Sequence, residues 1–221
     1  MIETLQSADA SLFTALNSLH APYFDQLQWL ISGKFSWLLM VLMLLYILSR
    51  KGGRQACAIV VAIALVVLLA DQISSSLIKP LVERLRPSHD PSLASTIHIV
   101  NDYRGGSFGF VSSHAANCFG VALLLCLLLR GRGVWCTLMA WATIVSYSRI
   151  YLGVHFPGDI LCGALVGAMV ACLVYRLWLH FTPRWSWAGG SVQATQQEEL
   201  WFLMAGGGNL LILVVVAFFM L

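Results

Sequence analysis

Charged side chains are scarce in this sequence. Asp, Glu, Lys and Arg together make up only 10% of its 221 residues, whereas 59% are hydrophobic and the mean hydropathy is +0.80. A typical soluble domain carries about 25% charged residues, so this composition excludes an ordinary soluble globule. The surplus apolar surface needs lipid to cover it, and the length suits one domain.

Other features are missing as well. The net charge is only +3 and the basic residues are scattered, so nothing resembles a nucleic-acid footprint. The first residues lack a basic stretch before an apolar core, which argues against a cleavable signal peptide. The six cysteines lie in or beside apolar stretches without metal-ligand spacing. We therefore expect small buried hydrophobic side chains rather than a disulfide framework.

Six apolar segments account for most of the chain. A helix needs about 20 predominantly apolar residues to span the hydrocarbon. The segments cover residues 35–49, 56–78, 110–129, 134–150, 158–180 and 200–220. We predict an all-α polytopic membrane bundle of about six transmembrane helices. The last is interrupted by three glycines and Asn209, which membrane helices tolerate better than soluble ones.

The two ends of the chain differ from the apolar centre. Residues 1–34 mix apolar and polar side chains, which favours one or two amphipathic helices in the membrane interface, broken near Pro22. A frayed terminus is the alternative. We divide the chain into an N-terminal interfacial segment (1–34), a core bundle (35–182), and a linker with a C-terminal transmembrane helix (183–221).

Ionisable groups occur in three short stretches, although membrane-embedded segments normally avoid them. The first, residues 79–87, closes the second span. Its Lys79 and Arg86 are seven residues apart, about two helical turns, so both can face one way. The Arg fork and the compact Lys charge both suit phosphate oxygens. Taken alone, this stretch is explained equally well by cations that snorkel to the membrane edge.

The second stretch, Ser112, Ser113 and His114, opens the third span after the glycine-rich residues 105–109. A helix N-terminus presents unpaired N–H groups and favours anions, although simple capping explains the serines as well. His114 by itself fits a satisfied polar residue. With cations nearby, it becomes a candidate general acid for a leaving oxygen.

The third stretch runs from Ser148 to Asp159. His155 and Asp159 are four residues apart, so the carboxylate can hold one imidazole nitrogen while the other attacks phosphorus. A structural His–Asp pair is the alternative. With Arg149, the three stretches predict a cationic site that binds a phosphate group and attacks it. Such a site would repel a divalent ion, so no metal is predicted.

The remaining polar residues are expected to be structural. Asp71, inside the second span, should pair with a buried cation or hydroxyl group. His20, His89 and His98 have no partner at useful spacing. Arg84 either pairs with a neighbour or contacts a lipid head group.

Positive charges are distributed unevenly between the two ends of the predicted bundle. Seven lie away from the polar stretches, namely Arg50, Lys51, Arg54, Arg130, Arg132, Arg176 and Arg184. Six lie on the other side, namely Lys34, Lys79, Arg84, Arg86, Arg104 and Arg149. When the three proposed phosphate ligands are set aside, the positive-inside rule places the site outside the cytoplasm, with both termini facing outward.

The three stretches resemble the signature motifs of the type 2 phosphatidic acid phosphatase family, K-x6-RP, PSGH and SR-x5-H-x3-D. The first and third match completely, at Lys79, Arg86 and Pro87 and at Ser148, Arg149, His155 and Asp159. The second matches in part: Val111 replaces the proline and Ser113 the glycine. Serine reaches φ > 0 less easily than glycine, which affects the family's backbone contact to the ligand. The resemblance covers about residues 56–180.

The resemblance implies a lipid phosphatase that works through a phosphohistidine. His155 would be the nucleophile, oriented by Asp159, and His114 would protonate the departing oxygen and then activate water. The phosphate would be held by Lys79, Arg86, Ser112, Ser113 and Arg149. No metal or other cofactor is required.

The resemblance also implies a location and a range of substrates. The protein would lie in the bacterial inner membrane, with its site facing the periplasm. Candidate substrates are undecaprenyl pyrophosphate, lipid A phosphate, phosphatidylglycerol phosphate and phosphatidic acid. We expect the long polar loop 88–109 to form a rim over the site that contacts the head group. Alternatives are a lipid phosphotransferase and a transporter or flippase. The sequence leaves the choice of lipid and the oligomeric state open.

Overall fold

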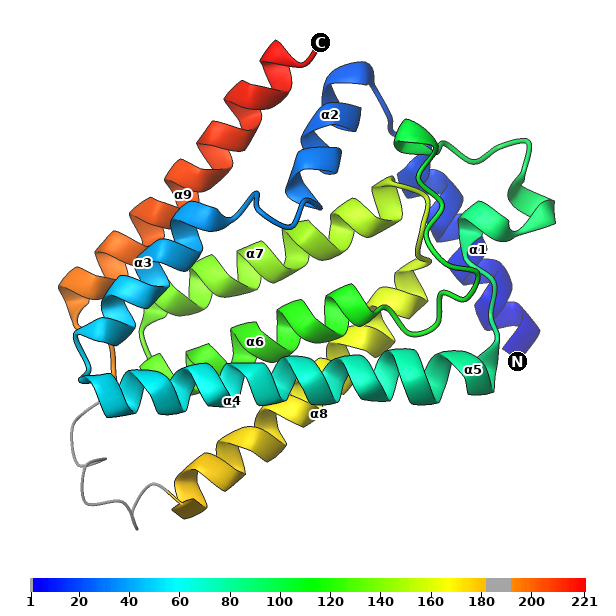
Figure 1. The fold of residues 1–221 in the computed structure, drawn as a ribbon. Coiled ribbons are helices and arrows are strands. Elements are labelled where there is room, and N and C mark those ends of the chain that lie inside the picture. The colour runs from blue at the N-terminus through cyan, green and yellow to red at the C-terminus, as the bar shows by residue number, and fades with distance from the viewer. Residues whose placement is uncertain (1, 182–191) are drawn as a thin grey trace.

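The computed structural model describes residues 2–181 and 192–221, whose regular elements are all helical (Figure 1). The α-helices are α1 (Ile2–Asn17), α2 (Pro22–Ile31), α3 (Leu38–Ser49), α4 (Gly53–Asp71), α5 (Lys79–Val82), α6 (Ser113–Leu129), α7 (Arg132–Tyr151), α8 (Pro157–Phe181) and α9 (Gln196–Phe219). A π-helical segment, η1 (Gln72–Ile78), joins α4 to α5. Short 3-10 helices, η2 (Pro87–His89), η3 (Pro91–Leu93) and η4 (Val100–Asp102), lie in the long loop before α6.

The predicted all-α membrane bundle is confirmed. Each of the six apolar segments corresponds to a helix or a continuous run of helices: α3, α4–η1–α5, α6, α7, α8 and α9. Three runs, 53–82, 157–181 and 196–219, are long and apolar enough to cross a membrane, and α3 and α6 are shorter apolar helices. The run 53–82 is longer than the predicted segment 56–78, because polar groups such as Arg54 and Lys79 are tolerated at the ends of a spanning helix.

The N-terminal part divides at Pro22 as predicted, since α1 ends at Asn17 and Pro22 opens α2. Helices α2 and α3 both pack along α9 (Figure 1). The hydroxyl group of Tyr23 donates to the carbonyl oxygen of Val214 across this contact (3.0 Å). Twelve residues of α3 rise only about 18 Å, so α2 and α3 together cover the length of α9. The proposed boundary at residue 34 stays a prediction, and the one at residue 182 lies outside the described residues.

The predicted interruption of the last span does not break the helix. Helix α9 continues through the glycines, and Gly206 faces the side chain of Thr137 on α7. Asn209 turns toward α3, where its Oδ1 accepts from the backbone N–H of Met40 (3.4 Å) and its Nδ2 donates to the carbonyl oxygen of Ser36. The small and polar residues therefore serve helix packing.

The six cysteines are free, and the expectation that they are buried within lipid stays a prediction. Only Cys126 is buried, whereas Cys57, Cys136 and Cys172 are exposed on the outer faces of helices. An apolar segment in a membrane has no need to bury every small side chain, because lipid solvates the outer face.

Glycines bring α6 and α8 into close contact. A Cβ atom at Gly167 would collide with the carbonyl oxygen of Ala116, and one at Gly163 would collide with that of Ser112. The N-terminal ends of the two helices are joined directly, since the N–H of Ser112 donates to the carbonyl oxygen of Asp159 (3.0 Å). This contact places the second and third polar stretches side by side.

We expect Gly167→Ala to destabilise the bundle by about 1–3 kcal/mol, the usual cost of overpacking. The measurement is the thermal unfolding midpoint of the purified protein in detergent. Gly207→Ala on α9 is the matched control, because a Cβ atom there meets nothing within 4 Å. An unfolding midpoint for Gly167→Ala as high as that of the control would contradict the assigned packing.

Candidate active site

The three polar stretches meet at one end of the bundle. A cavity of about 330 Å³ is lined by Lys79, Arg86, Ser113 and His114, together with residues of α4, η1 and α6. The third stretch lies beside this cavity, since Nη1 of Arg86 lies 3.5 Å from the carbonyl oxygen of Val154 and the N–H of Ser112 donates to the carbonyl oxygen of Asp159 (3.0 Å). The structure therefore brings the predicted site residues together.

His155 and Asp159 form the predicted pair at the start of α8. Nδ1 of His155 lies 3.4 Å from Oδ2 of Asp159, and the N–H of Phe156 donates to the same oxygen (3.0 Å). Pro157 occupies the first turn of α8, where its missing N–H costs nothing. Both members of the pair are buried, at 1% and 0% exposure. The carboxylate therefore fixes the orientation of the imidazole.

Burial keeps the His155 imidazole neutral. Loss of hydration is the main cause that lowers its pKa well below the ordinary value of 6.5, and the positive charges of Arg86, Arg149 and Lys79 lower the pKa further. A hydrogen bond to the backbone of Gly109 acts in the opposite direction. A neutral imidazole at pH 7 has a lone pair available for nucleophilic attack.

Arg149 is held at the C-terminal end of α7 by neutral partners. Its Nη2 donates to the hydroxyl group of Tyr103 (3.1 Å) and its Nη1 to that of Ser32. The residue is only 3% exposed, and its Nε has no partner among the described residues. A buried N–H without an acceptor is costly, and a bound anion would satisfy it.

The glycine-rich residues 105–109 pass close to the side chain of Arg86. Its Nε donates to the carbonyl oxygen of Phe108 (3.2 Å), and its Nη1 lies 3.5 Å from that of Val154. Gly105 has a φ of +68°, and a Cβ atom there would lie 2.7 Å from Nη1 of Arg86. The glycine therefore allows the backbone to approach the guanidinium group.

Ser113, one of the two residues that depart from the family motif, binds Lys79. Nζ of Lys79 donates to its Oγ (2.7 Å), and the same oxygen lies 2.8 Å from Oγ of Ser75. The hydroxyl group of Ser75 donates in turn to Asp71 (3.2 Å), which confirms the expected hydroxyl partner of Asp71. Ser75 was not predicted, because a serine in an apolar span gives no signal of its own.

Arg84 pairs with partners far away in the sequence. Its Nη1 donates to Oδ1 of Asp159 (3.0 Å) and its Nη2 to Oδ2 of Asp9 on α1 (2.8 Å). Its guanidinium carbon lies 4.0 Å from the ring centroid of Phe156. Arg84 is therefore ion-paired, but with Asp159 and Asp9 rather than with a sequence neighbour.

The loop histidines have no partner at useful sequence spacing, as expected, but the fold supplies partners for them. Nε2 of His98 lies 2.9 Å from Oδ1 of Asp25, and its ring stacks on that of His20 with centroids 3.9 Å apart. Nε2 of His89 lies 3.4 Å from the carbonyl oxygen of Gly105. All of these partners come from distant parts of the chain, where sequence spacing carries no information.

A family model described as the PAP2 superfamily matches residues 55–183. The chain belongs to this superfamily. A lipid A 4'-phosphatase of Bacteroides thetaiotaomicron is 42% identical over 186 residues, covering 83% of this chain and 83% of that protein. A lipid A 4'-phosphatase of Porphyromonas gingivalis is 38% identical over 185 residues, covering 83% and 78%.

Solved structures share the fold of this PAP2 protein. The crystal structure of Aquifex aeolicus LpxE gives a TM-score of 0.58 at 24% identity, covering 76% of this chain and 94% of that one. A PAP2-type phosphatidylglycerolphosphate phosphatase from Bacillus subtilis gives 0.59 at 23% identity, covering 80% and 87%.

The comparisons confirm the predicted family and the predicted class of enzyme, a membrane phosphatase that acts on lipid phosphates. The roles assigned to the site residues stay predictions.

Proposed function

We propose that this PAP2 protein hydrolyses a phosphate ester of a lipid A-type glycolipid at the periplasmic face of the bacterial inner membrane. The observation that carries the chemistry is the buried Arg149, with its unpaired Nε, beside Lys79, Arg86 and the His155–Asp159 pair. The choice of lipid is supported by the two relatives named lipid A 4'-phosphatase, which are 42% and 38% identical. A putative undecaprenyl-diphosphatase of Escherichia coli is 29% identical over a shorter stretch of 173 residues.

In the first step the phosphate group, with a charge of about −1.5 to −2, binds to Lys79, Arg86 and Arg149. The hydroxyl groups of Ser112 and Ser113 and the N-terminal end of α6 complete the cradle. Nε2 of His155 attacks phosphorus while His114 gives a proton to the departing lipid oxygen. Fixed cations stabilise the charge that spreads over the equatorial oxygens.

In the second step water attacks the phosphohistidine. His114, now neutral, takes a proton from the water, and the bond between phosphorus and Nε2 breaks to release inorganic phosphate. Asp159 holds the ring and stabilises the positive charge of the phosphorylated imidazolium, and the ring leaves as neutral imidazole while His114 keeps the proton for the next cycle. His114 is exposed to the cavity, whereas His155 is buried, as expected for an acid at the leaving-group side and a shielded nucleophile.

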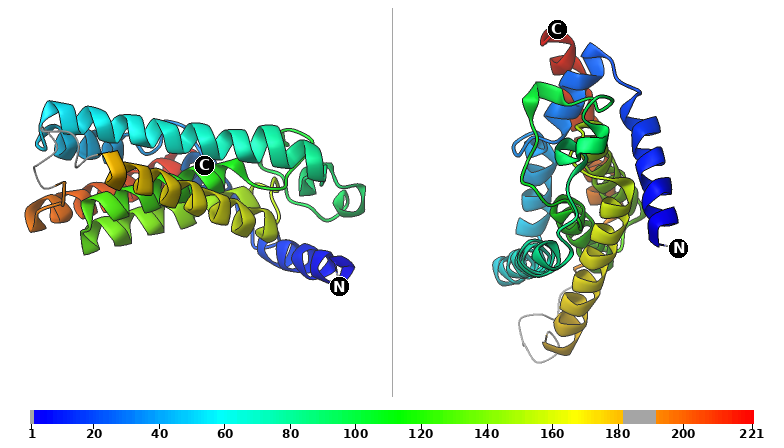
Figure 2. Two further views of the ribbon diagram at one scale, coloured as in Figure 1. Left: turned by 90° about the horizontal axis from the view of Figure 1, so that it is seen from below. Right: turned by 90° about the vertical axis from the view of Figure 1, so that its right-hand side faces the viewer.

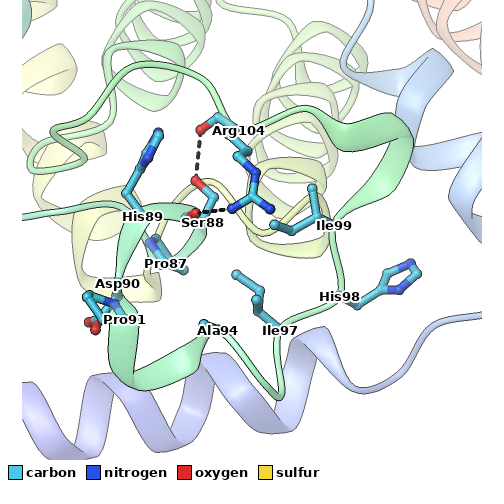
Figure 3. A pocket seen from close by; sticks show the side chains of 10 residues that line it. All are labelled: Pro87, Ser88, His89, Asp90, Pro91, Ala94, Ile97, His98, Ile99 and Arg104. Atoms are coloured by element: carbon cyan, nitrogen blue, oxygen red, sulfur yellow. Dashed lines mark hydrogen bonds between the residues drawn. The ribbon is translucent and has the colours of Figure 1, made fainter.

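A second cavity beside the phosphate site supports a large head group. It has a volume of about 550 Å³ and is lined by loop residues from Pro87 to Arg104 (Figure 3). Two hydrogen bonds join the two ends of this lining, Ser88 and Arg104. The Ser88 hydroxyl donates to the carbonyl oxygen of Arg104 (2.8 Å), and Nη1 of Arg104 donates to the carbonyl oxygen of Ser88 (2.9 Å). Pro87, which lines this cavity, directly follows Arg86, which lines the phosphate cavity, and we propose that a sugar attached to the bound phosphate extends toward it.

The distribution of cations supports a periplasmic site. Lys79, Arg86 and Arg149 belong to the proposed phosphate site. Lys34, Arg84 and Arg104 then remain at this end of the bundle. The opposite end keeps Arg50, Lys51, Arg54, Arg130, Arg132 and Arg176, while Arg184 lies outside the described residues. The positive-inside rule assigns that opposite end to the cytoplasm.

We expect His155→Ala to abolish phosphate release from lipid A and His114→Ala to slow it by about 10²–10⁴-fold. The assay is phosphate release in detergent by the purified protein, with the phosphoenzyme detected as an acid-labile phosphoryl group. His180→Ala, at the far end of α8, is the control and should keep full activity.

Three outcomes would contradict the mechanism. His155→Ala with full activity would remove the nucleophile. A wild-type protein that releases no phosphate from any lipid phosphate would favour a flippase. Transfer only to an acceptor other than water would favour a phosphotransferase.

We expect Arg104→Gln to raise KM for lipid A by about tenfold, because the variant loses the proposed hydrogen bond from the charged guanidinium group to the sugar. A hydrogen bond to a charged group contributes about 1.5–3 kcal/mol. KM for phosphatidic acid, which lacks a sugar, should stay within about twofold. The two values are measured on the same preparation, so that the lipid without a sugar serves as the control. Equal increases for both lipids would show that the cavity does not bind the head group.

Ser95 is exposed on the loop at the site end and Ser49 is exposed at the opposite end. We expect a cysteine at Ser95, in a background with the six native cysteines replaced, to react with a membrane-impermeant thiol reagent in intact spheroplasts. Ser49→Cys should react only after the membrane is permeabilised. The reverse pattern would place the site in the cytoplasm.

A further inference from the structure

We propose that Asp9 of α1 and Arg84 are positioning residues that hold Asp159 in place for the phosphoryl transfer, so that the N-terminal helix is part of the catalytic unit. This inference rests on the proposed function of His155 and Asp159. Helix α1 lies outside residues 55–183, which the family model matches.

Asp9 reaches the start of α8 from the neighbouring helix. Its Oδ1 accepts from the N–H of Gly158 (2.7 Å) and its Oδ2 accepts from Nη2 of Arg84 (2.8 Å). A Cβ atom at residue 158 would lie only 2.7 Å from Oδ2 of Asp9, so the glycine allows this approach. Asp9 therefore caps a helix to which it does not belong.

Arg84 lies between two carboxylates and is fixed on both sides. Nη1 of Arg84 donates to Oδ1 of Asp159 (3.0 Å), and the second carboxylate oxygen, Oδ2, faces Nδ1 of His155. The side chain of Asp159 is fully buried and those of Arg84 and Asp9 are 19% and 14% exposed. Removing one partner of such a buried group leaves an uncompensated charge, so the three groups act as one unit.

Helix α1 is anchored at two further points, both C-terminal to Asp9. Phe13 is 1% exposed and packs edge-on against Phe156, the residue after His155, with ring centroids 5.3 Å apart. Nδ2 of Asn17 donates to the carbonyl oxygens of Tyr151 (2.9 Å) and His98 (3.1 Å). The two views of Figure 2 show α1 on the outer side of the bundle at the end where α8 begins.

These contacts predict an effect on turnover rather than on binding. Neither Asp9 nor Arg84 lines the phosphate cavity or the head-group cavity. Both act on the residue that orients the nucleophile. Loss of either should let the Asp159 carboxylate rotate, so that the imidazole spends less time aimed at phosphorus.

The test uses the full-length protein with Asp9→Asn and Arg84→Met, assayed for phosphate release from lipid A. We expect kcat to fall by about 10–100-fold, the usual cost of losing a partner that orients a functional side chain. KM and the inhibition constant of inorganic phosphate should stay within about threefold. Glu3→Gln, an exposed carboxylate on the same helix, is the matched control and should keep the wild-type kcat.

A double variant separates positioning from general loosening of the fold. Asp9→Asn keeps an oxygen that can accept from the N–H of Gly158, so the charge that it removes acts through Arg84. The substitution should therefore slow the Arg84→Met protein by no more than about twofold, whereas independent structural effects would multiply. All assays are run well below the unfolding midpoint of each variant. Should Arg84→Met fail to fold, Arg84→Lys keeps the charge but loses the fork, and the same loss in kcat is expected.

Two results would overturn the inference: a kcat within twofold of wild type for Asp9→Asn or for the Arg84 variant that folds, or losses that multiply in the double variant. Failure of the proposed function looks different, because the wild-type protein itself would then release no phosphate.

Discussion

The buried carboxyl group of Asp159 is the point at which the three polar stretches are tied together. Its side chain faces His155 of the third stretch and accepts from Arg84 of the first. Its backbone carbonyl oxygen accepts from the N–H of Ser112, the first residue of the second. A single residue at the start of one helix thus fixes the relative positions of groups that lie far apart in the chain. The glycines between α6 and α8 allow this by bringing the two helices close enough for the backbone contact.

The site separates cations that are neutralised from cations that are not. Arg84 is paired with two carboxylates, whereas Lys79, Arg86 and Arg149 are held by hydroxyl groups and carbonyl oxygens among the described residues. Neutral acceptors orient a cation without cancelling its field. Lys79, Arg86 and Arg149 therefore keep the positive charge that the proposed phosphate site needs. The same field, added to burial, lowers the pKa of His155 and keeps its lone pair free.

The sequence was sufficient for features that depend on local composition or on fixed spacing. Hydropathy located the helices, because a lipid-facing helix must be apolar along its whole length. The His155–Asp159 contact followed from a separation of four residues. Contacts between distant segments were out of reach. Tyr103 and Ser32 on Arg149, Asp25 on His98 and Asp9 on Arg84 are each separated by dozens of residues from their partners. The sequence predicts that α1 is amphipathic, but it does not show that Asp9 faces inward, because a buried and a solvated carboxylate look the same in sequence.

Ser113 shows why a departure from a motif needs a structure to interpret. Replacement of glycine suggested a weaker backbone contact to the ligand, but the hydroxyl group has its own partner in Lys79. The π-helical segment between α4 and α5 places Ser75 next to it, so that Lys79 and Asp71 are connected through two hydroxyl groups. The extra oxygen therefore fixes one of the cations that the site depends on.

The loop of residues 88–109 contains none of the residues proposed for bond breaking, but backbone hydrogen bonds join its base to the phosphate site. The N–H of Arg86 donates to the carbonyl oxygen of Ser107 (3.0 Å), and that of Gly109 donates to the carbonyl oxygen of Arg84 (2.8 Å). These paired bonds close the loop at its base, directly beside the phosphate cavity. Residues inside the loop can then change the shape of the larger cavity without moving Arg86. Such an arrangement would let one phosphate site serve different lipids, because the proposed head-group contacts lie in the loop and the proposed bond-breaking groups lie at the helix ends.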